Sequence, residues 1–162
     1  MKLGILFDRF GPYHVARIKG AMRYAQVLAI EGAPHRAVYD WARPSLPKDL
    51  EYAVLAERKG QEASPEHIME RLEQIVPPFA PDAIALPGWS NLITLVALKW
   101  CHKRGIPAVC MSESNAWDFK RRTLTEATKK GIVAHYTAGL ATNVSQIGYL
   151  EWLGLSSDTV FS

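Results

Sequence analysis

The chain has 162 residues, 48% of them apolar, and a formal net charge of +3. A chain of this length and composition can bury one core, which favours a single domain over residues 1–162. Its basic residues are scattered outside the segment 120–130, so charge gives no reason to expect a nucleic-acid partner. No apolar run approaches about 20 residues and no basic leader opens the chain, so we expect a cytoplasmic protein without a membrane span or signal peptide.

The first half of the chain alternates between strand and helix patterns. A continuous apolar run ends at Phe7, as in a strand covered on both faces, and apolar residues then recur at helical spacing from Val15 to Ala29. Gly32 can end such a helix, and Pro77 with Pro78 can end the next one. The predicted elements are strands over residues 3–7, 35–41 and 52–56, a loop over 42–50, and helices over 12–31 and 65–76.

The second half repeats the alternation. Ser90 or Asn91 can cap the third helix and Asp118 the fourth, while Gly105 and Gly131 follow their last turns. The predicted elements are strands over residues 83–86, 108–111, 132–138 and 157–161, and helices over 92–104, 119–130 and 140–153.

These alternating units predict an α/β Rossmann-like fold, a three-layer α/β/α sandwich with a mainly parallel sheet joined by right-handed crossovers. Ligands of such sheets bind outside the carboxyl ends of the strands. The Gly11 loop and the Ser112 loop both follow buried strands, so we expect them to open on the same edge and share a cleft.

The turn after the first strand carries the first group of candidate site residues. Pro12 suits the first helical position after Gly11, and a helix N-terminus at a strand's carboxyl end offers free N–H groups. His14 is either a ligand-facing group or a first-turn histidine that bonds nearby backbone. Arg17 is either a solvated helix residue or a guanidinium that grips a carboxylate or phosphate in the cleft.

Two later strands also end in polar or aromatic residues. Ser112, Glu113 and Ser114 follow one strand, and their alternative role is turn closure. Glu113 is the stronger candidate, because a turn does not require a carboxylate there, whereas Asp118 fits a helix cap better than a catalyst. Trp89 follows the other strand and can form a stacking platform for a sugar ring.

The sequence lacks the common motifs of several enzyme classes. The chain contains no G-x-G-x-x-G, P-loop, H-E-x-x-H, C-x-x-C or G-x-S-x-G sequence, so we expect no dinucleotide cofactor, no metal and no serine-hydrolase chemistry. Cys101 and Cys110 fall in apolar patterns and are expected to be reduced core residues. The basic segment is either a solvated face or a surface for phosphate or anionic membrane, and it contains Lys120, Arg121, Arg122, Lys129 and Lys130.

The pattern F-x-x-x-G-P-Y-H-x-x-R from Phe7 to Arg17 resembles the opening of bacterial family 4 glycosyltransferases of the two-domain type called GT-B. Two later segments are similar to further family patterns, and the resemblance covers nearly the whole chain. The first of these segments is Ser112-Glu113-Ser114, followed by Asp118, Arg121 or Arg122, Glu126 and Lys129 or Lys130. The second is Gly139 with Tyr149, Leu150, Leu153 and Gly154.

The resemblance implies that residues 1–162 form the N-terminal, acceptor-binding domain of an enzyme whose second domain binds the nucleotide-sugar donor. A sugar or a lipid-linked sugar would be the acceptor, and transfer would need no metal or other cofactor. His14 and Glu113 are then the catalytic candidates. Many members carry a histidine where this chain has Ser112-Glu113, which leaves that histidine's role unassigned. The acceptor-binding candidates are Gly11, Pro12, Tyr13, Arg17, Trp89, Ser112, Ser114, Asp118, Arg121 and Arg122.

Two other interpretations of the sequence stay open. One is a stand-alone flavodoxin-like or sugar-binding module without catalysis, and the other is a small α/β enzyme complete in itself. The second is disfavoured because no set of nucleophile, base and orienting group is evident. For the 162-residue chain alone we expect folding without nucleotide-sugar binding, with self-association as a side effect. Peripheral contact with the inner face of the membrane is a separate expectation for the cytoplasmic protein.

Overall fold

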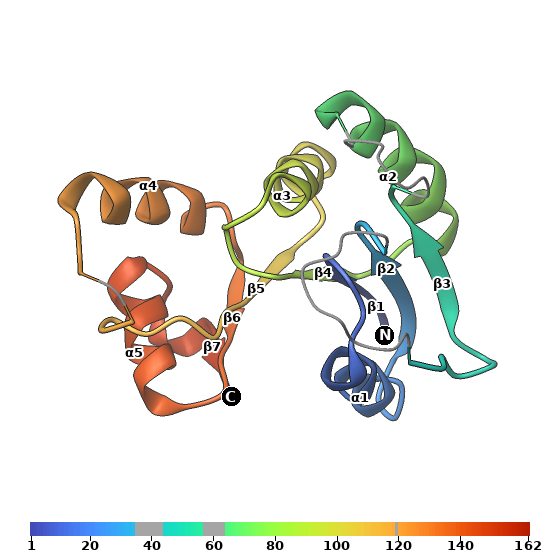
Figure 1. Cartoon of the computed structure of the whole chain (residues 1–162), viewed down its shortest axis with the longest axis horizontal. Helices are drawn as coiled ribbons and strands as arrows, with labels where there is room; N and C mark the ends of the chain where they lie inside the picture. The colour runs from blue at the N-terminus through green and yellow to red at the C-terminus, as the bar shows by residue number, and fades with distance from the viewer. Residues whose placement is uncertain (35–43, 57–63, 119) are drawn as a thin grey trace.

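The computed structural model describes residues 1–34, 44–56, 64–118 and 120–162 (Figure 1). In this part of the chain seven strands form one sheet and alternate with five α-helices and a short 3-10 helix. The strands are β1 (Lys2–Phe7), β2 (Gln26–Glu31), β3 (Glu51–Val54), β4 (Ala83–Leu86), β5 (Ala108–Met111), β6 (Ala138–Leu140) and β7 (Val160–Phe161). The helices are α1 (Pro12–Ala21), α2 (Pro65–Phe79), α3 (Leu92–Arg104), α4 (Thr123–Val133), α5 (Val144–Leu153) and η1 (Ser157–Thr159).

The sheet has the strand order β3-β2-β1-β4-β5-β6-β7, and every neighbouring pair of strands is parallel. The chain therefore moves outward from β1 in one direction and then, after β3, outward from β1 in the other. The predicted Rossmann-like fold with a parallel sheet is confirmed. The reversal falls between β1 and β4, which is where doubly wound sheets open a crevice for ligands.

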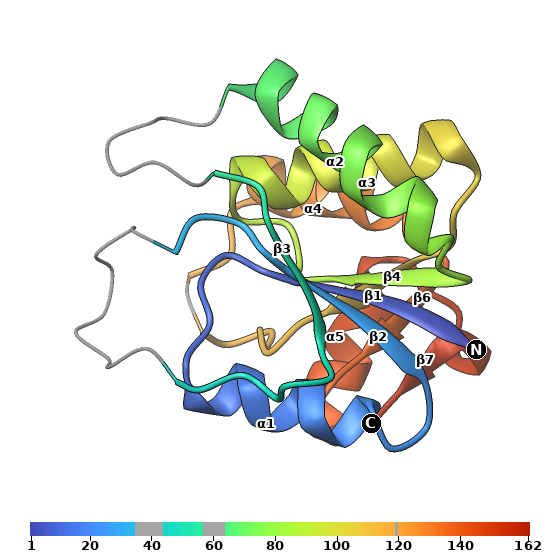
Figure 2. The ribbon, with the colours of Figure 1, turned by 90° about the vertical axis from the view of Figure 1, so that its right-hand side faces the viewer.

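Helices cover both faces of the sheet (Figure 2): α2, α3 and α4 lie on one face and α1 and α5 on the other. Alternate residues of β1 contribute to the hydrophobic cores on the two faces of the sheet, because side chains along a strand point to opposite faces. Leu6 joins the core under α2 and α3, whereas Ile5 and Phe7 pack with Val15 and Ile18 of α1.

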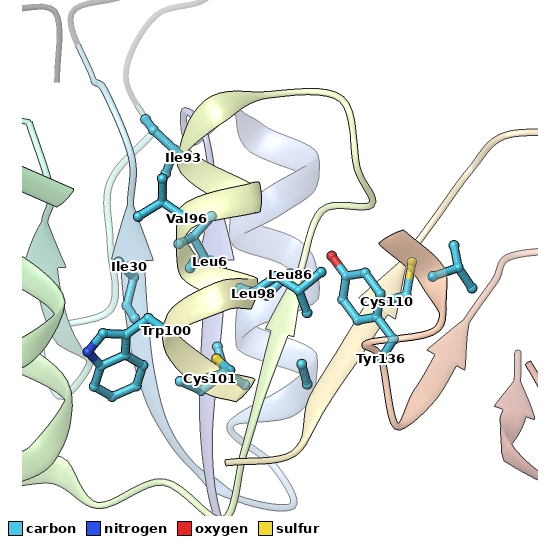
Figure 3. Packing of buried hydrophobic residues seen from close by; sticks show 14 of the residues in the cluster. Leu6, Ile30, Leu86, Ile93, Val96, Leu98, Trp100, Cys101, Cys110 and Tyr136 are labelled. Carbon is cyan, nitrogen blue, oxygen red and sulfur yellow. The ribbon is translucent and has the colours of Figure 1, made fainter. Parts of the chain in front are cut away.

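The larger core is centred on α3. Figure 3 shows Val96 of this helix near Leu6 and Trp100 near Ile30 of β2. Cys101 and Cys110 are free thiols buried in the same core, as predicted. The helix begins where Asn91 accepts the N–H of Thr94 at 2.8 Å and ends at Gly105, whose φ of 67° is the left-handed conformation that favours glycine.

The long first helix predicted over residues 12–31 is wrong. α1 ends at Ala21, and the last third of the predicted span is β2. Val27 to Glu31 are all buried because β2 lies between β1 and β3 and is covered on both faces. Such a strand has no alternation, so Ala29 matched a helical spacing by coincidence. The predicted strand over 35–41 lies outside the described residues.

Three other predicted boundaries in the middle and last parts of the chain are corrected. Pro77 and Pro78 lie inside the end of α2, which closes on the bond from the Ala80 N–H to the Val76 carbonyl at 3.0 Å. α4 begins after Arg122 and not after Asp118, and it continues through Gly131 to Val133. Gly131 does not adopt the positive φ that ends α3 at Gly105, so it is an ordinary helical residue and not a cap.

The last elements are shorter than predicted. The predicted strand over 132–138 is reduced to β6 from Ala138, because α4 extends to Val133. α5 begins after Asn143, whose side chain accepts the N–H of Gln146 at 3.0 Å. The 3-10 helix at Ser157–Thr159 occupies most of the predicted final strand. None of the helices in the described ranges is long and apolar enough to span a bilayer.

Candidate functional site

Two hydrogen bonds fasten the turn between β1 and α1. The N–H of Phe10 donates to Oε1 of Glu31 at 2.7 Å, and the N–H of Gly11 donates to Nδ1 of His14 at 3.0 Å. Gly11 is the N-cap of α1 and Pro12 its first residue, as predicted. The His14 side chain thus satisfies a backbone donor beside the first turn of its own helix. The turn is held over the carboxyl end of β1.

The imidazole of His14 lies against the ring of Phe7, with 4.4 Å between ring centroids. Burial lowers the pKa of His14, and the charge of Arg17 lowers it further, although the carboxylate of Glu113 acts in the opposite direction. Because Nδ1 accepts the Gly11 N–H, the neutral ring carries its hydrogen on Nε2. His14 is therefore a neutral imidazole whose Nε2–H can donate a hydrogen bond.

Arg17 and Glu113 form an ion pair between α1 and the loop after β5. Nη1 of Arg17 lies 3.6 Å from Oε1 of Glu113, and the Arg17 guanidinium lies 5.8 Å from the Phe7 ring centroid and 5.6 Å from that of Tyr13. Burial and the Glu113 carboxylate raise the pKa of the Tyr13 hydroxyl. The Arg17 side chain is 22% exposed and that of Glu113 is 58% exposed, so the carboxylate remains accessible to a ligand.

These groups line a cleft of about 250 Å³ at the reversal between β1 and β4. The first wall comes from Phe7, His14 and Arg17. The rest comes from residues 87–90 of the loop after β4, from Met111 at the end of β5 and from residues 112–114 of the loop that follows. The Gly11 and Ser112 loops therefore lie at the same edge of the sheet, as predicted. Gly11, Pro12 and Tyr13 shape the turn beside the cleft and are not among its lining residues.

Trp89 is a half-buried aromatic in the loop after β4, and it lines the cleft. Its ring meets that of Tyr149 edge to face at 6.2 Å, and Nζ of Lys129 lies 6.0 Å from its centroid. The preceding Gly88 has a φ of 64°, and its carbonyl accepts a hydrogen bond from the Tyr136 hydroxyl. The loop that carries Trp89 is thus tied down from the underlying core.

Ser112 and Ser114 close the loop that follows β5. Oγ of Ser112 accepts the N–H of Ser114 at 3.3 Å, and the N–H of Ser112 continues the sheet to Leu140 at 3.2 Å. Ser112 is 6% exposed. Both serines line the cleft, but the Ser112 hydroxyl is used in the turn, which is the alternative role that the sequence left open.

Asp118 and Arg122 lie outside the set of residues that line the cleft. Asp118 caps no helix: its Oδ2 accepts the Asn115 N–H at 2.6 Å and its Oδ1 the Asn115 side-chain amide at 3.2 Å. These hydrogen bonds from Asn115 lower the pKa of Asp118. Arg122 is the exposed N-cap residue of α4 and makes no side-chain capping bond. The Asp118 carboxylate thus closes the turn that begins at Asn115, and neither Asp118 nor Arg122 faces the cleft.

Arg121 belongs to a polar cluster between α4 and α5, which we call the Glu126 cluster and which consists of Arg121, Glu126, Lys129 and Tyr149. Glu126 accepts from the Tyr149 hydroxyl at 2.6 Å, from Lys129 at 2.9 Å and from Arg121 at 3.1 Å. Burial raises the pKa of Glu126, but the three donors outweigh it and bring this pKa to about 2. The cluster adjoins the cleft through Trp89, which the Tyr149 ring and the Lys129 ammonium both approach.

Sequence reasoning missed Glu31, and it quoted Tyr149 in a family pattern without assigning it to the site. Glu31 is 1% exposed at the end of β2, where it accepts from Phe10 and from the Tyr52 hydroxyl. The role of Glu31 was not predicted because residues 26–31 were assigned to a helix and not to a strand. A glutamate at the end of an apolar run was the one available signal. Among the described residues, no three His, Cys, Asp or Glu side chains are grouped to hold a metal ion.

Solved structures with a similar fold include UDP-N-acetylglucosamine 2-epimerases. The Neisseria meningitidis enzyme bound to UDP-GlcNAc matches with a TM-score of 0.67 at 16% identity, over 99% of this chain and 46% of that one. The Rickettsia bellii enzyme matches with a TM-score of 0.65 at 16% identity, over 99% of this chain and 43% of that one. The chain thus spans less than half the length of these enzymes.

At such identities the likeness shows the fold alone. No protein-family profile and no curated protein sequence matches the chain. The chain is a Rossmann-like α/β domain, and its structural neighbours include these sugar-nucleotide epimerases.

Proposed function

We propose that this chain is the acceptor-binding domain of a glycosyltransferase that moves a sugar from a nucleotide-sugar donor to a hydroxyl group. The observation that carries the proposal is the position of the His14 donor, the Arg17–Glu113 pair and the Trp89 ring around one cleft at the strand-order reversal. The GT-B-like fold supports a sugar-nucleotide enzyme. The motifs from Phe7 to Arg17 and from Ser112 to Ser114 support the glycosyltransferase.

Each group has a role in this reaction. The acceptor hydroxyl attacks the anomeric carbon of the donor sugar, a new C–O bond forms, and the bond to the nucleotide diphosphate breaks. Glu113, with its exposed carboxylate, takes the hydroxyl proton as general base. His14 donates from Nε2 to an oxygen of the acceptor and so fixes its orientation, since its neutral tautomer leaves Nε2 unable to accept a proton.

The charges of the cleft favour an uncharged sugar as the acceptor group bound there. Arg17 is paired with Glu113 at 3.6 Å, and the lowered pKa of His14 keeps its ring neutral. A phosphate would need cations that are not already engaged. The apolar face of a sugar ring suits the Trp89 side chain, and its hydroxyls suit Glu113 and His14.

The interaction can be tested on the 162-residue chain with methyl glycosides and disaccharides, followed by saturation-transfer NMR. Trp89→Ala should abolish binding, whereas Trp117→Ala, at a 73% exposed tryptophan outside the cleft lining, should leave it unchanged. Nucleotide sugars should show no saturable binding to this chain, because the cleft offers no cradle of donors for a diphosphate. Saturable nucleotide-sugar binding in the absence of sugar binding would overturn the acceptor role.

A second candidate is half of a nucleotide-sugar epimerase, which the UDP-N-acetylglucosamine 2-epimerase neighbours favour. The two activities differ in what they consume. A transferase that contains this chain releases nucleotide only when an acceptor sugar is added, whereas a 2-epimerase converts UDP-GlcNAc without one. Assays of the full-length enzyme with UDP-GlcNAc, with and without acceptor, decide between them.

A further inference from the structure

A second cavity, of about 310 Å³, lies between α3 and α4, away from the sheet edge that carries the cleft. α3 starts at the loop that carries Trp89 and runs back toward the opposite edge of the sheet (Figure 2). Residues three and four positions apart on a helix share one face, and the α3 residues that line the cavity have this spacing. The lining residues are Leu95, Leu98, Lys99 and His102 of α3, with Gly131, Ile132 and His135 at and beyond the end of α4.

The lining combines an apolar surface with nitrogen donors. Leu98 is 4% exposed and belongs to the main core, against which Ile132 also packs. Lys99, His102 and His135 are exposed, and the two imidazoles meet edge to face with 5.1 Å between centroids. No aspartate or glutamate is among the residues that line this cavity. Its polar groups therefore all favour an anion.

We propose that this cavity binds a small amphipathic anion, a carboxylate attached to an apolar chain. The chain would displace water from the surface of Leu95, Leu98 and Ile132. The carboxylate would accept from Lys99 Nζ and from an imidazole N–H, and hydrogen bonds between charged partners are the stronger kind. A volume of about 310 Å³ lies at the small end of the range for ligand sites, which fits a medium-length acyl chain.

The charge of the head group follows from the lining. A neutral alcohol with the same chain would leave Lys99 without a partner, and a quaternary ammonium would be repelled by it. The α3 carbonyls near the cavity also carry partial negative charge, but Lys103 lies in the last turn of α3, and its ammonium offsets that charge. The carboxylate is placed at Lys99, one turn before the helix end.

The test uses the 162-residue chain, with decanoate as the probe and decanol and decyltrimethylammonium as comparisons, in calorimetric titration and NMR. Gly131→Leu should abolish decanoate binding, since an added Cβ there meets no atom within 4 Å and the longer side chain fills the cavity. Gly148→Leu is the matched control: it lies on α5, its added Cβ also meets nothing within 4 Å, and it is outside the cavity lining. Lys99→Gln should weaken binding about tenfold, the usual effect of losing a bond to a charged group.

Saturable decanoate binding that survives Gly148→Leu and is lost in Gly131→Leu supports the site. Equal decanoate binding by the chain and the Gly131→Leu variant overturns it, as does the absence of saturable binding. Decanol or decyltrimethylammonium binding as tightly as decanoate overturns the anion specificity. The cavity and the cleft share no lining residue, so these outcomes are separate from those for the proposed acceptor site.

Discussion

Nδ1 of His14 accepts the backbone N–H of Gly11 at 3.0 Å, and this one bond gives the histidine both a structural and a chemical role. It fastens the start of α1, as a first-turn histidine does, and it also fixes the tautomer that points an Nε2–H outward. The two alternatives that the sequence offered for His14 are therefore not exclusive.

His14→Ala should lower turnover of the full-length enzyme by more than about tenfold, because a positioned donor typically contributes at least that much. It should also destabilise the domain by about 1 kcal/mol through the lost capping bond. Steady-state kinetics and urea unfolding measure the two effects. His67→Ala is the control, since His67 Nε2 also bonds backbone, at Leu55, 3.1 Å away, but His67 does not line the cleft. Equal turnover of the two variants would leave His14 with a structural role alone.

The stability contributed by His14 should decline below neutral pH. Its pKa is lowered on folding, chiefly by burial, so the unfolded chain takes up a proton more readily than the folded one. The contribution is present above the unfolded value of 6.5 and is lost as the pH falls from there toward the folded pKa. The difference in unfolding free energy between the wild type and His14→Gln should shrink from pH 7 to pH 5, as urea titrations would show. A constant difference would contradict the burial of a neutral ring.

Local signals in the sequence predict the fold better than they predict its boundaries. The strands β1, β4 and β5 were found because each is an apolar run closed by turn residues. Glycine and asparagine located both ends of α3, because their conformational freedom or side-chain oxygen has a specific use at a helix terminus. The cleft's position then followed from where parallel strands end.

Tertiary packing explains what the sequence did not predict. β2 was taken for helix because a strand buried on both faces has no period of its own. Asp118 resembled a helix cap, yet Asn115 lies within its reach. The pattern also left Arg121 or Arg122 and Lys129 or Lys130 open, and the structure places Arg121 and Lys129 on Glu126. Arg121 and Lys129 face Glu126 because α5 brings Tyr149 beside all three side chains. A contact between distant parts of the chain of this kind leaves no local sequence pattern.

Glu126→Gln should destabilise the domain by about 3 kcal/mol, because removing the charge leaves Arg121 and Lys129 facing a neutral partner in a mostly buried site. The lowered pKa of Glu126, about 2 against 4.5, adds a pH signature. Its contribution is present above pH 4.5 and is lost as the pH falls toward 2, so the wild type and the variant should converge in acid. Glu151→Gln, at an exposed position of the adjacent helix α5, should have little effect. Similar unfolding midpoints for both variants would show that the cluster adds no stability.

Glu31→Ala should loosen the turn that carries His14. The carboxylate accepts the Phe10 N–H at 2.7 Å and is 1% exposed, so its removal strands a buried donor at a cost of about 2 kcal/mol. Amide exchange at Phe10 should accelerate, and sugar binding in the cleft should weaken with it. Glu51→Ala, at the exposed start of β3, provides the comparison. Unchanged protection of the Phe10 amide would mean that the turn is held by other contacts.

The two cysteines should resist alkylation while the domain is folded. Burial raises the pKa of both the Cys101 and the Cys110 thiols to about 12, so at pH 8 their thiolate fraction is about a thousandfold below that of a free thiol. Iodoacetamide followed by mass spectrometry should find an unmodified chain in buffer and two modified cysteines in denaturant. Ala116→Cys, at an exposed position of the loop after β5, should react at the rate of a free thiol and so calibrate the measurement. Rapid labelling of the native thiols would show that the core around α3 opens, and the cleft that rests on it would then lack a rigid wall.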